Sequence, residues 1–268
     1  MRKYALVTGA AGGIGQVVAR RLADRDYTVL AAERDDDLAA RAAHAITGAV
    51  PITCDLDDAD AVRSLCERVS AEWTSNLEIA FLNAGTVVPG DVVDSDPADI
   101  DSQLRIMLSS TVHLAQAAAQ VMSRQGHGHI VATVSQGAVL SLPGSAAYSA
   151  AKAGLRAFLA ALHLELRGSG VTVGGVYPSA VDTAMLRHEA NHNGSLLNFV
   201  GTVSTVEDVA DGVDKAIRTG GLEVFLPRSD ALSVKLLQLF PRLVPLLLPL
   251  AERIGERGRL RYLATTSS

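Results

Sequence analysis

Two kinds of segment alternate along the chain. Short, almost wholly apolar runs are typical of strands buried on both faces of a sheet, and they occupy residues 4–7, 27–32, 50–53, 77–82, 129–134, 171–176 and 223–226. Apolar residues at three- and four-residue spacing predict helices over 14–23, 38–45, 57–73, 100–122 and 148–166, although the fit is loose in 100–122. Strands that alternate with helices predict an α/β fold with a parallel sheet.

The 268 residues are consistent with one domain, 1–268, because no linker and no internal repeat divides them. The one shift in composition begins near Ser233. From there a leucine-rich segment interrupted by prolines forms a C-terminal extension, 233–268.

Composition narrows the class of protein. Apolar residues make up 48%, which excludes a mainly disordered chain. The net charge of −5, with no basic block, argues against a nucleic-acid partner. The spacing of Cys54 and Cys66 matches no metal or redox motif, and the N-terminus lacks the features of a signal peptide. We therefore expect a reduced, cytoplasmic protein.

A glycine-rich turn, TGAAGGIG, lies between the first predicted strand and the first predicted helix. Glycines in such a turn let the backbone approach a pyrophosphate, and the helix N-terminus adds free N–H groups and partial positive charge. A glycine turn alone is a weak signal, but its place between strand and helix strengthens it. The predicted dinucleotide-binding residues here are Gly9, Gly12, Gly13, Ile14 and Gly15.

The end of the second predicted strand carries Glu33 and Arg34. Glu33 follows Gly15 by 18 residues, near the offset of about 20 at which a carboxylate accepts hydrogen bonds from the ribose of NAD. Such a carboxylate repels the 2′-phosphate of NADP, whereas an arginine can pair with it. We therefore predict NAD as the preferred cofactor, with NADP possible through Arg34.

Tyr148 and Lys152 are spaced i, i+4 at the start of a predicted helix, so both can point into one site. A neighbouring ammonium favours the phenolate and lowers the pKa of a tyrosine, which makes the pair a candidate acid and base. Ser135 follows the fifth predicted strand, where strand ends border the ligand crevice of parallel sheets. A tyrosine and lysine at this spacing also occur as an ordinary amphipathic pair.

Taken together, TGAAGGIG, the serine, YSAAK and YPSAVDT resemble the short-chain dehydrogenase/reductase family over roughly residues 3 to 230. The resemblance implies a three-layer Rossmann fold, a doubly wound parallel sheet of seven strands with helices on both faces. It implies hydride transfer between a nicotinamide and an alcohol or carbonyl carbon. Tyr148 would be the acid/base, Lys152 would lower its pKa and bind the ribose, and Ser135 would orient the substrate oxygen. Further cofactor contacts implied by the resemblance are Asp55, Leu56, Asn83, Ala84, Gly85, Pro178, Val181 and Thr183.

Three positions depart from the family pattern. Leu82 replaces the first asparagine of a two-asparagine turn, and Ser179 replaces the glycine after Pro178. Met107 stands where many members have an asparagine that helps to hold a water linked to the lysine. We expect the proton relay to be altered while hydride transfer survives. Alternatively, Met107 is simply a core residue.

Residues 184–200 occupy the place of the family's variable substrate lid, and we expect a mobile loop that closes over the substrate. His188 and His192 are spaced for metal binding, but a third ligand is lacking, so we expect no metal. The extension 233–268 is too interrupted by proline and arginine for a membrane span. It would cover the substrate pocket, form a subunit contact, or rest peripherally on a membrane surface.

The sequence thus predicts an NAD(P)-dependent oxidoreductase of small lipophilic secondary alcohols or ketones, assembled as a homo-oligomer, a dimer or a tetramer. Two alternatives stay open. Met107 and Ser179 are compatible with a cofactor-binding regulatory or scaffold protein of weakened catalysis, and the extension is compatible with a lipid-modifying reductase at a membrane surface.

Overall fold

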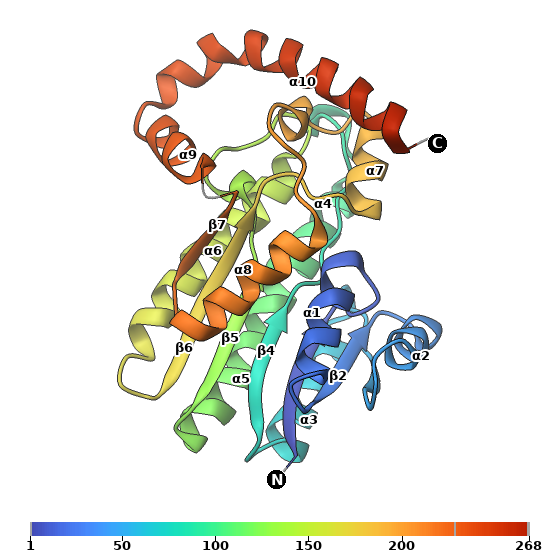
Figure 1. Ribbon diagram of the computed structural model, residues 1–268, viewed down its shortest axis with the longest axis vertical. Helices are drawn as coiled ribbons and strands as arrows, with labels where there is room; N and C mark the ends of the chain where they lie inside the picture. Colours follow the sequence, from blue (N-terminus) through green and yellow to red (C-terminus); the bar gives the residue numbers. More distant parts are fainter. Residues whose placement is uncertain (1, 228, 267–268) are drawn as a thin grey trace.

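The computed structural model describes residues 2–227 and 229–266. Its centre is a sheet of seven parallel strands in the order β3-β2-β1-β4-β5-β6-β7 (Figure 1). This is the Rossmann-type order that the resemblance implied, and the predicted fold class is confirmed. The strands are β1 (Lys3–Thr8), β2 (Tyr27–Glu33), β3 (Val50–Thr53), β4 (Leu77–Leu82), β5 (Gly128–Thr133), β6 (Val171–Pro178) and β7 (Glu223–Leu226).

Two hydrophobic cores lie on opposite faces of the sheet, because successive side chains of a strand point to opposite sides. In β1, Ala5 and Val7 belong to one core and Leu6 to the other. The first core is covered by α1 (Gly13–Ala23), α2 (Asp36–His44) and α8 (Val206–Thr219). The second is covered by α3 (Ala59–Glu72), α5 (Ser110–Gln125) and α6 (Ala146–Glu165). The result is the three-layer arrangement in Figure 1.

The helix predicted over 100–122 is divided into three parts. α4 (Pro97–Leu104) is followed by a π-helical turn, η2 (Arg105–Ser109), and then by α5. A π-helical turn adds a residue and shifts the helical phase, which explains why apolar spacing fitted a single helix poorly. Met107 lies in this turn, is fully buried and packs against Gly85, so it is a core residue.

The C-terminal region adds helices beyond the sheet. They are α7 (Ala184–Asn191), η4 (Leu196–Phe199), α9 (Asp230–Leu239), η5 (Pro241–Leu243) and α10 (Val244–Thr266). The predicted lid, 184–200, is therefore largely helical rather than an irregular loop. α10 packs on it so closely that a Cβ at Gly258 would stand 2.0 Å from the carbonyl oxygen of Phe199. Within 2–227 and 229–266, each helix is too short or too polar to cross a bilayer.

The order of the strands creates a crevice where β1 and β4 lie side by side. The chain builds outward from β1 through β2 to β3, then returns to the other side of β1 for β4. At such a switch point the connections leave in opposite directions, so a space opens beyond the carboxyl ends of the two strands. Gly9 follows β1 and Asn83 follows β4, so both lie at this crevice.

Candidate active site

The glycine-rich turn after β1 is held by backbone hydrogen bonds. Gly9 has a φ of 67°, which favours glycine, and its N–H donates to the carbonyl oxygen of Ala32 at 3.0 Å. The N–H of Gly12 donates to the carbonyl oxygen of Gly9 at 3.1 Å. α1 begins at Gly13, and among the described residues no side chain caps it. Its first N–H groups are therefore free to bind an anion such as a pyrophosphate.

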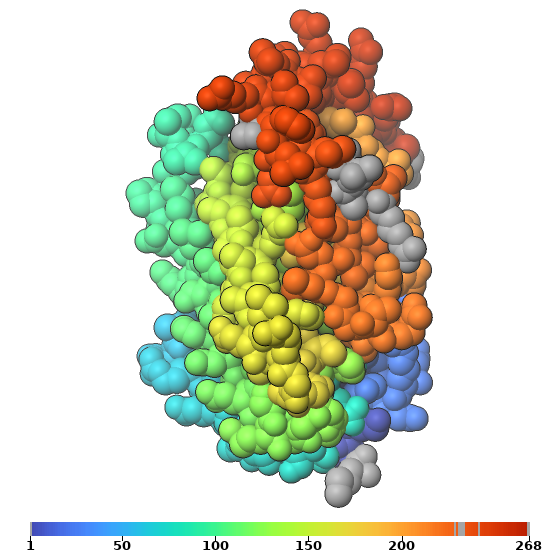
Figure 2. Space-filling model, turned by 90° about the vertical axis from the view of Figure 1, so that its left-hand side faces the viewer, coloured from blue at the N-terminus to red at the C-terminus, as the bar shows by residue number. Residues whose placement is uncertain are grey.

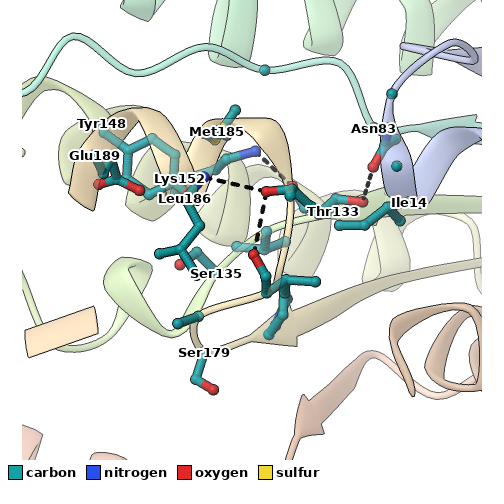
Figure 3. A pocket seen from close by; sticks show the side chains of 18 of the residues that line it. Ile14, Asn83, Thr133, Ser135, Tyr148, Lys152, Ser179, Met185, Leu186 and Glu189 are labelled. Atoms are coloured by element: carbon teal, nitrogen blue, oxygen red, sulfur yellow. Dashed lines mark hydrogen bonds between the residues drawn. The ribbon is translucent and has the colours of Figure 1, made fainter. Parts of the chain in front are cut away.

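Asn83 ties three strand ends together. Its N–H donates to the hydroxyl of Thr8 at 2.9 Å, as does the N–H of Ala84 at 3.1 Å. Its side-chain oxygen accepts from the Thr133 hydroxyl at 2.9 Å, which joins β4 to β5 (Figure 3). Asn83 thus holds the strand ends at the crevice together, although Leu82 stands where the family has another asparagine.

Ser135, Tyr148 and Lys152 meet in one cavity (Figure 3). Lys152 is 4% exposed, and its ammonium donates to the carbonyl oxygen of Thr133 at 2.7 Å. It also lies 5.8 Å from the centroid of the Tyr148 ring. The Ser135 hydroxyl accepts from the N–H of Gly137 at 3.0 Å, which fixes its orientation beside the tyrosine. α6 and the end of β5 thus position all three groups.

The pKa values of Tyr148 and Lys152 differ from those expected from the sequence. Burial raises the pKa of Tyr148 to about 12, and the interaction with the Ser135 hydroxyl only partly offsets it. Burial also lowers the pKa of Lys152 to about 8. The expected lowering of the tyrosine pKa by the ammonium is absent: desolvation dominates, and the charge of Glu189 adds to the rise. At neutral pH Tyr148 is a phenol that can give a proton and Lys152 is still mostly charged.

The cavity around this group has a volume of about 200 Å³. It is lined by most of the predicted cofactor and catalytic residues, namely Gly9, Gly12, Gly13, Ile14, Asn83, Ala84, Gly85, Ser135, Tyr148, Lys152, Pro178, Val181 and Thr183. Gly15 is buried beneath the glycine turn. The other four predicted residues lie at or just after the ends of β2 and β3 and outside the cavity lining; they are Glu33, Arg34, Asp55 and Leu56.

The groups after β2 and β3 form the predicted adenosine side of the site. The Glu33 carboxylate accepts from the N–H of Ala11 at 2.6 Å and so is held against the glycine turn. Arg34 is exposed and pairs with Asp35 at 3.4 Å. Asp55 is exposed and accepts from the N–H of Asp57 at 2.9 Å, whereas Leu56 is buried.

Glu189 lines the cavity and was missed by sequence reasoning. It is 8% exposed on α7, lies on the Tyr148 side of the cavity, and accepts from the Asn198 amide at 3.1 Å (Figure 3). Burial raises its pKa to about 7. A signal existed, because Leu186, Glu189 and Ala190 have the i, i+3, i+4 spacing of one buried helix face.

We expect Glu189→Gln to stabilise the protein at pH 8 but hardly at pH 5. A carboxyl whose pKa rises from 4.5 to about 7 on folding favours the folded state below pH 4.5. That contribution is lost as pH rises through 7, at a cost of about 3 kcal/mol. The neutral glutamine avoids this cost, so its melting temperature should exceed the wild type's by about 5–10 °C at pH 8. Glu67→Gln, an exposed change on α3, is the control; equal effects at both pH values would contradict the assignment.

The residues around the cavity fit a nicotinamide dinucleotide. The start of α1 offers free N–H groups, and Gly12 and Gly13 line the cavity, so a side chain at either position would narrow it. Within the described part of the chain, the buried Ser179 hydroxyl has no hydrogen-bond partner and lines the same cavity. It is a ready polar contact for an amide.

Metal ligands do not gather in the described residues. The rings of His188 and His192 stack 4.2 Å apart. In 2–227 and 229–266, no group of three or more His, Cys, Asp or Glu side chains is placed to hold an ion.

Comparison with known proteins gives consistent matches. The family model described as short chain dehydrogenase matches residues 3–194. An uncharacterized short-chain type dehydrogenase/reductase of Sinorhizobium fredii is 32% identical over 202 residues, covering 73% of this chain and 77% of the relative. The cis-4-hydroxycyclohexanecarboxylate dehydrogenase of Sinomonas cyclohexanicum is 31% identical, covering 79% and 87%. A short-chain dehydrogenase from Sphingobium yanoikuyae, solved in complex with NADPH, superposes with a TM-score of 0.74 at 26% identity, covering 89% and 95%.

Proposed function

The chain belongs to the short-chain dehydrogenase/reductase family of NAD(P)-dependent oxidoreductases, and from this membership we propose that it interconverts a lipophilic secondary alcohol and its ketone. The observation that carries the proposal is the convergence of Ser135, Tyr148 and Lys152 on one cavity that begins at the glycine turn. A nicotinamide dinucleotide, when bound, supplies or accepts the hydride at the substrate carbon.

The protein's own residues manage the proton. In reduction, the Tyr148 phenol donates its proton to the substrate oxygen as that oxygen gains charge; in oxidation, the phenolate takes it back. Ser135, held by Gly137, donates a hydrogen bond that orients the same oxygen. The charged Lys152, fixed by Thr133, stabilises the phenolate that reduction leaves behind.

The substrate side of the cavity supports a mainly apolar molecule. Leu142, Met185 and Leu186 contribute its apolar wall, and apolar pockets with few polar groups select lipophilic ligands. Glu189 lies beside this wall, and its carboxyl would accept a hydrogen bond from a second hydroxyl on the substrate. The relative of Sinomonas cyclohexanicum is named as a dehydrogenase of a cyclic hydroxy acid, whose ring hydroxyl is a secondary alcohol.

NAD is the proposed preferred cofactor. Glu33 is held at the glycine turn, and three aspartates, Asp35 to Asp37, follow Arg34 at the start of α2. This concentration of carboxylates disfavours a 2′-phosphate, and Arg34 is already engaged with Asp35. Since the related protein from Sphingobium yanoikuyae was solved with NADPH, both cofactors are compared in the test below.

We expect Glu33→Ala to weaken NADH binding by about tenfold or more and to improve NADPH relative to NADH. The loss of a charge-assisted hydrogen bond to a ribose hydroxyl costs about 1.5–3 kcal/mol, and the repulsion of a 2′-phosphate falls. Parallel fluorescence titrations with both cofactors measure the ratio. Glu67→Ala, an exposed change on α3 outside this acidic run, should leave it unchanged. An unaltered ratio in Glu33→Ala would contradict the proposed role.

The proposed oxidoreductase is tested directly by cofactor turnover with a panel of hydrophobic ketones and alcohols. The competing function, a cofactor-binding regulatory protein, is motivated by Met107 and Ser179 and predicts binding without turnover. The presence of Ser135, Tyr148 and Lys152 together in the cavity lining favours the oxidoreductase over this alternative. As in the family at large, we expect assembly into a homo-oligomer, which sedimentation would measure.

A further inference from the structure

The end of the molecule formed by α9, η5 and α10 exposes a concentration of large apolar side chains, here called the leucine-rich surface. Leu246 is 75% exposed and Leu239 is 69% exposed. The leucine-rich surface is defined over residues 236–254 by Leu236, Leu239, Phe240, Leu243, Leu246, Leu247, Leu250 and Ile254. Figure 2 shows these helices projecting as the upper end of the molecule, and Figure 1 shows α10 extending past the body it covers. A patch of this kind marks a contact with a partner or a lipid surface.

The charge around the leucine-rich surface is opposite to that of the rest of the chain. Residues 236–266 contain five arginines and two glutamates, a net charge of +3, whereas the whole chain carries −5, so the remainder carries −8. The two glutamates lie on a different side of α10 from Leu246 and Leu250, since each follows one of these leucines by six residues. Glu256 pairs with Arg259 at 2.9 Å, and Glu252 lines a hollow shared with Asp91 and Ser195.

Arginines continue the apolar stripe along α10. Leu246, Leu250, Arg253 and Arg257 are spaced i, i+4, i+7, i+11, which places them on one side of the helix. Arg253 and Arg257 are exposed. An apolar face flanked by exposed arginines is the pattern of a helix that lies in the headgroup region of a membrane.

We propose that the leucine-rich surface docks on an anionic lipid bilayer. The net charge of +3 is attracted to such a surface. It would be repelled by the same surface of a second copy, because like charges would face each other across the contact. Prolines at 245 and 249 and the arginines keep α10 from spanning the bilayer, so it rests at the interface.

This docking would bring the cavity close to the lipid. The C-terminal half of α10 is fastened to α7 and to the segment before it. Arg259 donates to the carbonyl oxygen of Ala190 in α7 at 3.3 Å, and Tyr262 donates to Asp182, two residues before α7, at 2.7 Å. α7 in turn contributes Met185, Leu186 and Glu189 to the cavity. The membrane face and the wall of the substrate cavity are thus one packed unit.

The test is flotation of the full chain with vesicles of phosphatidylcholine alone and of phosphatidylcholine with phosphatidylglycerol at a ratio of about 3:1. We expect binding to the anionic vesicles, weakened by salt. Leu246→Asp combined with Leu250→Asp should reduce it at least about tenfold. Arg253→Gln combined with Arg257→Gln should reduce binding to the vesicles that contain phosphatidylglycerol and leave any binding to pure phosphatidylcholine unchanged. The matched control, Val93→Asp, changes an equally apolar residue that is 90% exposed elsewhere and should bind as the wild type.

Three results would overturn the proposal. The first is a wild type that floats with neither vesicle. The second is a Leu246→Asp, Leu250→Asp variant that floats as well as the wild type. The third is a wild-type oligomer that this variant converts to monomer without a change in flotation, since the occupant would then be a second copy. Far-UV circular dichroism of each variant shows that it has folded. Because flotation requires no turnover, failure here is distinct from failure of the proposed oxidoreductase activity.

Discussion

Replacing Tyr148 by phenylalanine should reduce turnover by about 10²–10⁴-fold, the range expected when a general acid–base group is removed. The change takes away only the hydroxyl oxygen, which lies beside Ser135 and provides the acidic proton of the cavity. The ring and its packing over Lys152 remain, with the 5.8 Å separation between ammonium and centroid unchanged. Dinucleotide affinity should therefore stay within about threefold of the wild type.

The control for this variant is Tyr27→Phe. Tyr27 begins β2, at the end of the sheet opposite the cavity, and its hydroxyl donates to Glu78 at 3.0 Å. The Tyr27→Phe variant therefore also loses one hydrogen-bonded hydroxyl, but away from the cavity. Initial rates with an active ketone, together with a cofactor titration, separate chemistry from binding. If Tyr148→Phe retained more than about a tenth of the wild-type rate, the proton would have to come from another group. Glu189 would be the first to test, because it lies on the tyrosine side of the cavity.

The parts of the fold that follow from local patterns were predictable. All seven strands were located because each is a short apolar run between polar turns, and their parallel arrangement follows from the helices between them. α8 was not located, although Thr205 and Asp208 form a capping box that marks its start. The loosely fitting 100–122 pattern was informative, since the π-helical turn at Arg105–Ser109 is its cause.

Most residues of the candidate site could be predicted from the sequence, whereas the pKa values of their side chains, which depend on burial, could not. The positions of Ser135, Tyr148 and Lys152 come from their spacing on β5 and α6. The pKa values of Tyr148 and Lys152 come from burial, which depends on elements far away in the sequence, and burial reversed the expected shift for the tyrosine. Glu189 was overlooked for the same reason, because only packing of the lid makes its carboxyl a buried group in the cavity.

Replacing Gly15 by alanine should abolish measurable cofactor binding and lower stability. A Cβ there would stand 2.0 Å from the carbonyl oxygen of Gly9 and 2.8 Å from its carbonyl carbon. Both are backbone atoms of the turn, and they cannot move aside independently because Gly9 is anchored to Ala32 and contacts the Asn83 amide. Either α1 or the turn must shift, at a cost of about 1–3 kcal/mol or more. The N–H groups that would hold a pyrophosphate move with them.

Gly12→Ala is the matched control, because it also replaces a glycine of this region by alanine but does not force α1 away from the turn. Its Cβ would be 3.3 Å from the same Gly9 oxygen, a tight contact that a small adjustment relieves. The added methyl group would project where a pyrophosphate approaches, so Gly12→Ala should melt close to the wild type yet bind NADH weakly. Gly15→Ala should lose both melting temperature and binding, as thermal unfolding and NADH titration measure. Wild-type binding by Gly15→Ala would mean that the approach of α1 to the turn does not position the cofactor, and the role of the glycine turn would then have to be reassigned.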